Sequence, residues 1–84
     1  YILRCADGTL YTGIATDLAR RLAEHNADDA LAARYTRTRR PVALVYSEAL
    51  ANRAEATRRE YAIKRLSRSA KLALIAGTDS PSNM

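Results

Sequence analysis

A tight-turn dipeptide near the start of the chain constrains the fold more than any other local feature. Asp7-Gly8 separates two β-prone runs, residues 1–5 and 10–14. An Asp-Gly pair between two such runs is typical of a β-hairpin, because both residues favour tight turns. The chain is therefore expected to begin with an antiparallel pair of strands.

Helical spacing follows the predicted hairpin. Leu18, Leu22 and His25 recur at spacings of four and three, which predicts a helix. Thr16 stands where it can cap the start of that helix, and Asp17 is favourable beside its positive end. We expect the first helix to begin at this point.

The middle of the chain is less regular. Residues 26–41 show no steady periodicity, and a short turn of helix is expected over 30–33. The Arg-rich stretch 34–40 is predicted to form a basic loop or an extended arm. Residues 42–47 are β-prone and predict a third strand.

A longer helix is predicted in the second half of the chain. Asn52 stands three places before Glu55, which is the spacing of a capping box. The helical pattern then runs through Ile63 and Leu66, with Tyr61 also expected on the buried side.

Ser67 is expected to end that helix before a last one, which carries Leu72, Leu74 and Ile75. The element order is then ββαβαα. A three-stranded sheet needs helices to cover it, so the prediction is a small α+β domain over residues 1–76. Residues 77–84 are polar and rich in helix breakers, and they are predicted to form a flexible tail.

The chain is basic, with a formal net charge of +5. Every basic residue except Lys64 and Lys71 is Arg, whose planar fork grips phosphate, so the composition favours a nucleic-acid partner. Charge that only keeps a small protein soluble is the alternative reading.

Cysteine usage and hydropathy give further expectations. Cys5 is the only cysteine, so no internal disulfide forms, and a reducing, cytoplasmic location is predicted. No apolar run reaches the roughly 20 residues that span a bilayer, which predicts no membrane partner. Because the chain begins at Tyr1, the start of the first strand is expected to be missing.

Four elements in order resemble the GIY-YIG nuclease superfamily, in particular its small stand-alone members, over residues 1–75. Tyr1 stands as the last letter of the GIY triplet, and Tyr11-Thr12-Gly13 stands in the place of YIG. Residues 17–25 match the helix pattern N-L-x-x-R-x-x-x-H with Asp in the first position. Residues 55–64 match a later helix that ends in E-x-x-x-K.

This resemblance implies an endonuclease that hydrolyses DNA phosphodiester bonds with Mg²⁺ or Mn²⁺. Glu60 is implied as the metal ligand, and one carboxylate with several waters is a common way to bind Mg²⁺. Spacing alone favours a surface ion pair of Glu60 with Lys64 one helical turn later, and only the accompanying motif reverses that preference.

The resemblance also implies roles near the scissile phosphate. Arg21, three places after Leu18, would direct its guanidinium at that phosphate, whereas the adjacent Arg20 would not. His25 lies one turn beyond Arg21 on the same helix face, and is implied as a proton shuttle or a phosphate hydrogen-bond donor. Gly13 would let the backbone or the substrate approach closely.

Tyr1 and Tyr11 are implied to lie side by side on the hairpin and to bind or deprotonate the attacking water. A phenol is a poor base at neutral pH unless a cation lowers its pKa, and Arg21 or the metal would supply that cation. Which tyrosine is the base stays open.

A basic arm with one stacking aromatic is expected to follow the phosphate backbone. Its predicted members are Arg34, Tyr35, Arg37, Arg39 and Arg40, with Lys64 and Arg68 extending the track. Charge runs are also common on solvated faces, so both readings stand.

Single-stranded or branched DNA is the expected substrate, in repair or in the processing of foreign strands, by a monomer or weak homodimer. The alternative is a DNA- or RNA-binding module of the same fold without catalysis. It is favoured by the absence of Asn from residues 64–75, where larger family members often carry one. A basic protein-interaction domain is a third reading.

Overall fold

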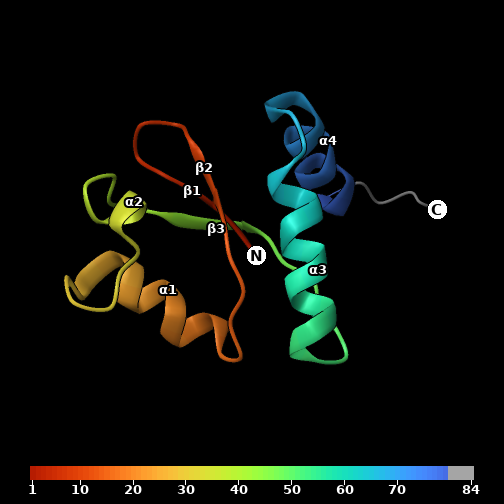
Figure 1. Cartoon of the computed structure of the whole chain (residues 1–84). Coiled ribbons are helices and arrows are strands. Elements are labelled where there is room, and N and C mark those ends of the chain that lie inside the picture. Colours follow the sequence, from red (N-terminus) through yellow and green to blue (C-terminus); the bar gives the residue numbers. More distant parts are fainter. Residues whose placement is uncertain (80–84) are drawn as a thin grey trace.

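The computed structural model describes residues 1–79 and contains a three-stranded antiparallel sheet with helices on both of its faces (Figure 1). The strands are β1 (Ile2–Arg4), β2 (Leu10–Thr12) and β3 (Ala43–Tyr46), with β1 in the middle. Both neighbours run antiparallel to β1. The predicted α+β class and the predicted sheet of three strands are confirmed.

Four helices form two groups around this sheet. In Figure 1, α1 (Leu18–Ala27) and α2 (Arg34–Arg37) lie to one side of the strands, and α3 (Arg53–Lys64) and α4 (Arg68–Asp79) lie to the other. Within residues 1–79, no helix is long and apolar enough to cross a membrane.

Adjacent residues of β1 supply two separate cores, because successive strand residues point to opposite faces. Ile2 packs with Tyr46 of β3, Ile63 of α3 and Ile75 of α4. The second core contains Leu3, Cys5 and Val42, with Leu22 of α1 packed against it. Since helices cover both faces of the sheet, the cavity described below lies beyond the strand ends, between the starts of α1 and α3.

The predicted hairpin is confirmed. Ile2 pairs with Thr12 across β1 and β2, and Gly8 adopts a positive φ of 85° in the turn. The Asp7 carboxylate accepts hydrogen bonds from the Thr9 main-chain nitrogen at 3.1 Å and from the Thr9 hydroxyl at 2.6 Å. These contacts hold the turn in the conformation that the Asp-Gly pair favours.

The first helix is confirmed, but its predicted cap is wrong by one residue. Asp17, and not Thr16, is the N-cap of α1, and its Oδ1 accepts from the Arg20 main-chain nitrogen at 3.1 Å. Asp17 directly precedes the first helical residue, so its carboxylate reaches the free N–H groups of the first turn. Thr16 lies too early to do so.

The prediction of a loop or extended arm over 34–40 is wrong for its first half. Arg34–Arg37 form the single helical turn α2, just after the stretch 30–33 where a turn of helix was expected. The Arg37 main-chain nitrogen donates to the Ala33 carbonyl at 3.0 Å, and Thr36 is fully buried. The burial of Thr36 is a tertiary contact, and it left no periodic signal in the sequence.

In α3, the predicted cap is confirmed, because Asn52 Oδ1 accepts from the Glu55 main-chain nitrogen at 2.9 Å. Ile63 is buried as expected. Tyr61 is not, since its side chain is 63% exposed. Two residues along a helix turn the side chain by roughly 200°, so Tyr61 and Ile63 face opposite ways.

The end of the chain is more helical than predicted. Ser67 separates α3 from α4 as expected, and its hydroxyl accepts from the Ala70 main-chain nitrogen at 3.1 Å. Helix α4 continues through Gly77 to Asp79, so the first three residues of the predicted tail are helical. The rest of that tail, residues 80–84, lies outside the described residues.

Candidate active site

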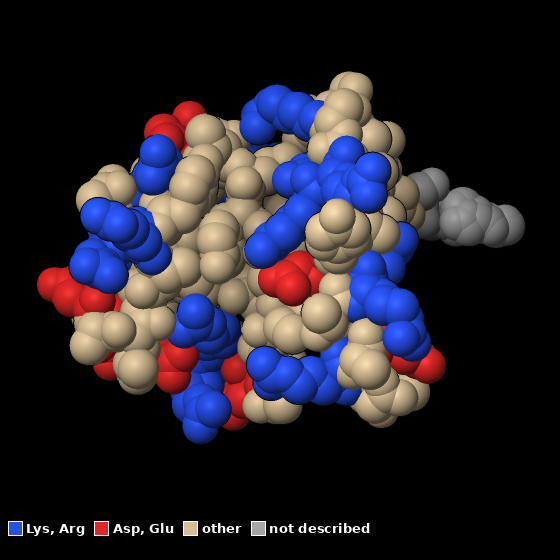
Figure 2. All heavy atoms as spheres, viewed as in Figure 1, with Lys and Arg blue, Asp and Glu red and all other residues tan. Residues whose placement is uncertain are grey.

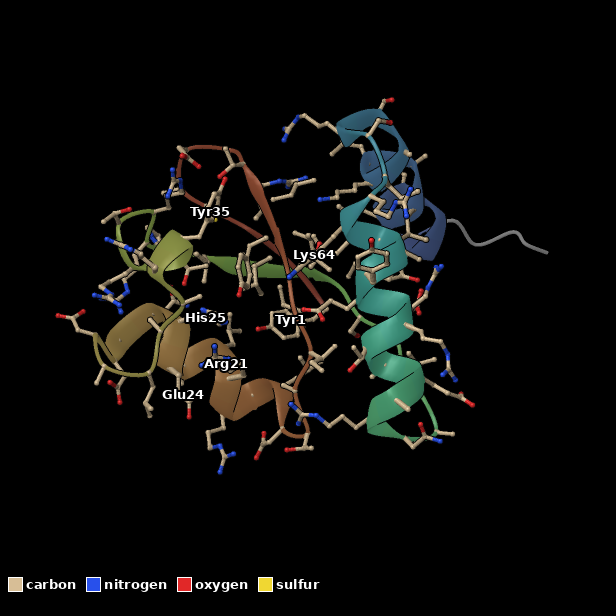
Figure 3. All side chains as sticks on the ribbon, viewed as in Figure 1. Tyr1, Arg21, Glu24, His25, Tyr35 and Lys64 are labelled. Atoms are coloured by element: carbon tan, nitrogen blue, oxygen red, sulfur yellow. The ribbon has the colours of Figure 1, made fainter. Side chains whose placement is uncertain are left out.

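Three side chains form a hydrogen-bonded chain that runs from the hairpin through α1 to α2. The Tyr1 hydroxyl lies 2.8 Å from His25 Nε2, and His25 Nδ1 lies 2.7 Å from the Thr36 hydroxyl. Thr36 in turn donates to the Ala33 carbonyl at 3.0 Å. Figure 3 shows Tyr1 and His25 facing each other between α1 and the strands.

This geometry fixes the imidazole tautomer. The Thr36 hydroxyl gives its hydrogen to Ala33, so it accepts the hydrogen on His25 Nδ1. His25 Nε2 is then left as an acceptor, and the Tyr1 hydroxyl donates to it. His25 is 0% exposed, so it has no direct access to a bound phosphate. Its position favours the proton-shuttle reading over the phosphate-donor reading.

The electrostatics keep both groups neutral. Burial lowers the pKa of His25 below its ordinary value, and the nearby Arg21 and Arg40 act in the same direction. Burial also raises the pKa of Tyr1, with Tyr11 and Glu60 adding to the rise and Arg21 opposing it. Arg21 therefore acts in the expected direction, but burial outweighs it and the pKa of Tyr1 stays above its ordinary value. A proton acceptor, His25, stands beside the phenol instead.

Gly13 is required by the position of the Tyr1 ring. A Cβ atom placed on Gly13 would lie 2.6 Å from the Tyr1 oxygen and 2.7 Å from Cζ. Main-chain hydrogen bonds hold the two residues together, with the Gly13 nitrogen 3.0 Å from the Tyr1 carbonyl. The close approach expected at Gly13 is thus made by a tyrosine of the same chain.

The two hairpin tyrosines differ in their surroundings. Tyr1 lines the cavity described next, whereas Tyr11 packs edge-on against His25, with ring centroids 5.4 Å apart. The Tyr11 ring also stacks on Tyr35 at 5.9 Å. Tyr11 therefore contacts His25 through its ring and does not line the cavity.

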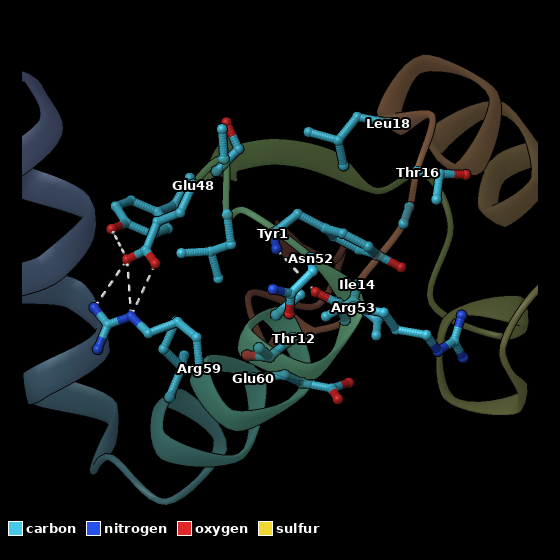
Figure 4. A pocket seen from close by; sticks show the side chains of 18 of the residues that line it. Tyr1, Thr12, Ile14, Thr16, Leu18, Glu48, Asn52, Arg53, Arg59 and Glu60 are labelled. Atoms are coloured by element: carbon cyan, nitrogen blue, oxygen red, sulfur yellow. Dashed lines mark hydrogen bonds and ion pairs between the residues drawn. The ribbon is translucent and has the colours of Figure 1, made fainter.

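A cavity of about 710 Å³ opens between the ends of the strands and the first turns of α3 (Figure 4). Tyr1, Gly13 and Glu60 all line it. Glu60 also forms an ion pair with Lys64 Nζ at 3.2 Å. Glu60 thus fits both interpretations of the sequence. Its side chain lines the cavity, as a metal ligand would, and it forms an ion pair with Lys64 of the same helix.

The residues present fit a mostly hydrated divalent cation. Within residues 1–79, no group of three or more His, Cys, Asp or Glu side chains is placed to hold a metal. Glu60 is a single carboxylate in an open cavity, which suits Mg²⁺ because that ion keeps several of its waters. Thr12 lines the same cavity, and its hydroxyl oxygen is buried and has no hydrogen-bond partner among the described residues. A metal on Glu60 would compete with Lys64.

Arg21 lies beside this cavity. Its Nη1 donates to Glu24 Oε1 at 3.0 Å and to the Leu31 carbonyl at 2.6 Å. Its side chain is 27% exposed, whereas that of the adjacent Arg20 is 71% exposed. Arg21, which the helix pattern selected, is thus the more buried of the two arginines, and Figure 3 shows it near Tyr1 and His25.

The residues of the predicted basic arm divide into two groups. Arg34 and Arg37 are exposed, and neither makes an ion pair with any residue in the range 1–79. Arg39 and Arg40 are held by other contacts. Figure 2 shows Lys and Arg side chains on both sides of the central hollow in this view.

Arg39 pairs with Asp7 at 3.2 Å, and its guanidinium lies 3.9 Å from the centroid of the Tyr35 ring. Arg40 donates to the His25 carbonyl at 2.7 Å and to Asp29 at 2.7 Å. These contacts tie α2 to the hairpin and to α1. Arg39 and Arg40 thus have partners within the protein, which disfavours a role in following a phosphate backbone. Tyr35 contacts both Tyr11 and Arg39, which disfavours stacking on a base.

A second charged contact at the cavity was not predicted from the sequence. Glu48 accepts three hydrogen bonds from Arg59, at 2.8, 3.0 and 2.8 Å, and also one from the Tyr46 hydroxyl. Both Glu48 and Arg59 line the cavity. Arg59 holds the pKa of the Glu48 carboxyl below its usual value. Glu48 lies before α3 begins at Arg53, so the two residues do not share a helix and sequence reasoning had no signal for this pair.

The domain combines a three-stranded sheet with a cavity that is lined by a helical glutamate and by a tyrosine hydrogen-bonded to a buried histidine. This is the architecture that the four sequence elements imply. A family model described as the GIY-YIG catalytic domain matches residues 1–73. The chain belongs to the GIY-YIG family.

The chain is also similar to several UPF0213 proteins. The chain is 58% identical over 79 residues to the UPF0213 protein DP2720 of Desulfotalea psychrophila, covering 94% of this chain and 71% of that protein. It is 55% identical over 74 residues to the UPF0213 protein VNG_2274C of Halobacterium salinarum, covering 88% and 94%. The solution NMR structure of the UPF0213 protein BH0048 from Bacillus halodurans is similar, with a TM-score of 0.60 and 43% identity. That match covers 96% of this chain and 84% of the other.

Proposed function

We propose that this protein is a divalent-metal-dependent endonuclease that hydrolyses DNA phosphodiester bonds. Tyr1, Arg21 and Glu60 are proposed to act at the reacting phosphate, and His25 to act through Tyr1. The observation that carries the proposal is the 2.8 Å contact between the Tyr1 hydroxyl and His25 Nε2 beside a cavity that Glu60 also lines. Hydrolysis needs an activated water, compensation of charge on the phosphate and assistance to the leaving oxygen.

Tyr1 is proposed as the group that activates the water. As the Tyr1 oxygen takes a proton from the attacking water, its own proton passes to His25 Nε2. Neutral His25 is suited to accept that proton, and Thr36 keeps the acceptor nitrogen turned toward Tyr1. We propose Tyr1 rather than Tyr11 for this role, because Tyr1 lines the cavity and Tyr11 packs against the imidazole ring.

Arg21 is proposed to stabilise the charge that builds on the phosphate oxygens. Its contacts to Glu24 and the Leu31 carbonyl hold the guanidinium in one orientation, so little reorganisation is needed during the reaction. Glu60 is proposed to hold Mg²⁺ or Mn²⁺, which would supply Lewis-acid stabilisation of the phosphate and the leaving oxygen when bound.

Single-stranded or branched DNA is the proposed substrate, and repair or the processing of foreign strands in the cytoplasm is the proposed setting. Exposed Arg34, Arg37, Lys64 and Arg68 are candidates for contacts to the phosphate backbone. A monomer or weak homodimer is the proposed state. The buried free thiol of Cys5 is compatible with a reducing compartment.

A DNA- or RNA-binding module without catalysis is the second candidate. The ion pair of Lys64 with Glu60 favours it, because that cation occupies the carboxylate on which the metal depends. The absence of Asn from residues 64–75 favours it as well.

The deciding experiment is a cleavage panel over single-stranded, duplex and branched DNA with Mg²⁺, Mn²⁺ or EDTA. We expect cleavage with metal, none with EDTA, and a loss of about 100-fold or more for both Arg21→Ala and Glu60→Ala. Glu55→Ala is the matched control, since Glu55 is an exposed acid on the same helix. DNA binding without metal-dependent cleavage would support the second candidate instead.

A further inference from the structure

A second hollow adjoins the cavity that contains Glu60. It has a volume of about 190 Å³ and lies against the start of α1. The two hollows share four lining residues: Ile14, Ala15, Thr16 and Arg53. A chain bound in the larger hollow would therefore pass directly into the smaller one.

Three guanidinium groups and two carboxylates line this second hollow, and the carboxylates are already engaged. Asp17 caps α1, and Glu24 pairs with Arg21 at 3.0 Å and with Arg20 at 3.7 Å. Arg53 also lines the hollow, and it makes no hydrogen bond or ion pair through its side chain with any described residue. Its positive charge is therefore available to a ligand.

Arg53 is also placed to reach both hollows. It is the first residue of α3, and Figure 4 shows its side chain extending across the mouth of the larger cavity toward α1. Arg20, on the other wall, is 71% exposed and has only the long contact to Glu24. Two accessible guanidiniums thus face one hollow from two different helices.

We propose that Arg53 and Arg20 form a second phosphate subsite, which holds the backbone phosphate adjacent to the one that is cleaved. The inference rests on the proposed function, because the ligand is a strand whose next phosphate lies at Glu60. A guanidinium offers paired N–H donors that match phosphate oxygens, and two from opposite walls suit a single phosphate group. The subsite would select strands with at least two consecutive phosphates.

The test measures binding in EDTA, so that it does not depend on catalysis. Fluorescence anisotropy compares a labelled dinucleotide, with one internucleotide phosphate, against a labelled tetranucleotide, with three. Wild-type protein should bind the longer ligand more tightly. Arg53→Ala should lose about tenfold in affinity for the tetranucleotide, and the slope of log affinity against log salt should fall by about one.

Arg58→Ala is the matched control, because Arg58 is an exposed arginine of α3 that lines neither hollow. It should bind as wild type does, while Arg20→Ala should weaken the tetranucleotide more than the dinucleotide. Arg53→Gln, with its thermal unfolding checked by circular dichroism, repeats the test if the alanine variant is poorly folded. Equal binding by wild type and both Arg53 variants would overturn the subsite but leave the proposed nuclease intact. No binding of either ligand or of longer DNA by wild type would overturn both.

Discussion

The Tyr1 hydroxyl lies 2.8 Å from Nε2 of His25, which is fully buried and is oriented from its other side by Thr36. This contact joins the first residue of the chain to a residue near the end of α1. It explains why a lone histidine is buried in a small basic domain, since both of its ring nitrogens have partners.

The buried imidazole predicts a pH dependence of stability. Burial lowers the pKa of His25 below its ordinary value of 6.5, so below that pH the unfolded chain binds more protons than the folded one. The free energy of unfolding should therefore fall as the pH drops below about 6.5. Thermal unfolding followed from pH 7.5 to 5 measures this.

The variant His25→Gln should show a flatter dependence over the same range. Tyr1, Arg21, Glu24 and Arg40 surround position 25 in both proteins, so their contribution cancels in the comparison. Parallel curves for the two proteins would contradict the assignment of the effect to His25.

Replacement of Gly13 by Ala should displace the Tyr1 ring. A Cβ atom 2.6 Å from the Tyr1 oxygen cannot be accommodated without movement, so we expect a loss of about 1 to 3 kcal/mol in the free energy of unfolding. Urea denaturation measures the loss, and Tyr1→Ala in the same protein should recover part of it.

The matched control is Gly77→Ala, since nothing lies within 4 Å of a Cβ atom placed there. Gly77 lies within α4, where alanine should stabilise the helix by roughly 0.5 to 1 kcal/mol. A Gly13→Ala variant as stable as wild type would mean that the ring is not held over the glycine.

The cap of α1 offers a comparison between neighbouring residues. Asp17→Ala should lower the free energy of unfolding by about 1 kcal/mol, because the Arg20 main-chain nitrogen loses its acceptor. Thr16→Ala should change it little. Denaturant titration of the two variants measures both, and a larger loss for Thr16→Ala would restore the cap predicted from the sequence.

The contact of Glu48 with Arg59 should stabilise the packing of α3 next to Glu60. Arg59→Ala is expected to lower the free energy of unfolding by about 1 kcal/mol, since the pair is partly exposed and solvent screens it. Arg58→Ala should change it little. Because Arg59 lowers the pKa of Glu48, this stabilisation is present above the ordinary value of 4.5 and is lost as the pH falls through the lowered pKa. The difference in the free energy of unfolding between wild type and Arg59→Ala should therefore be smaller at pH 3 than at pH 7, as measured by denaturation.

Local signals in the sequence predicted most of the fold. Asp7-Gly8 predicted the hairpin, Asn52 predicted the start of α3, and Ser67 predicted the break before α4. Each depends on residues close together in the chain, where turn and capping chemistry acts. The helical turn α2 was missed because the burial of Thr36 against His25 is a contact across 11 positions.

At the site, too, local patterns predicted some residues, and contacts between separate elements were missed. Helical spacing brought Arg21 and His25 to one face of α1, and the family pattern selected Glu60, which faces the cavity. The ties of Arg39 and Arg40 and the pairing of Glu48 with Arg59 join separate elements. The composition indicated only that basic side chains were plentiful, because it carries no information on which of them find acidic partners.

The most direct test of the account compares DNA cleavage by Tyr1→Phe and Tyr11→Phe under single-turnover conditions with Mg²⁺. Both changes remove one hydroxyl and keep the ring. Because only Tyr1 both lines the cavity and donates to His25 among the described tyrosines, Tyr1→Phe should slow cleavage by about 100-fold or more, and Tyr11→Phe should retain most of the wild-type rate. Wild-type cleavage by Tyr1→Phe, or a selective loss in Tyr11→Phe, would contradict the account.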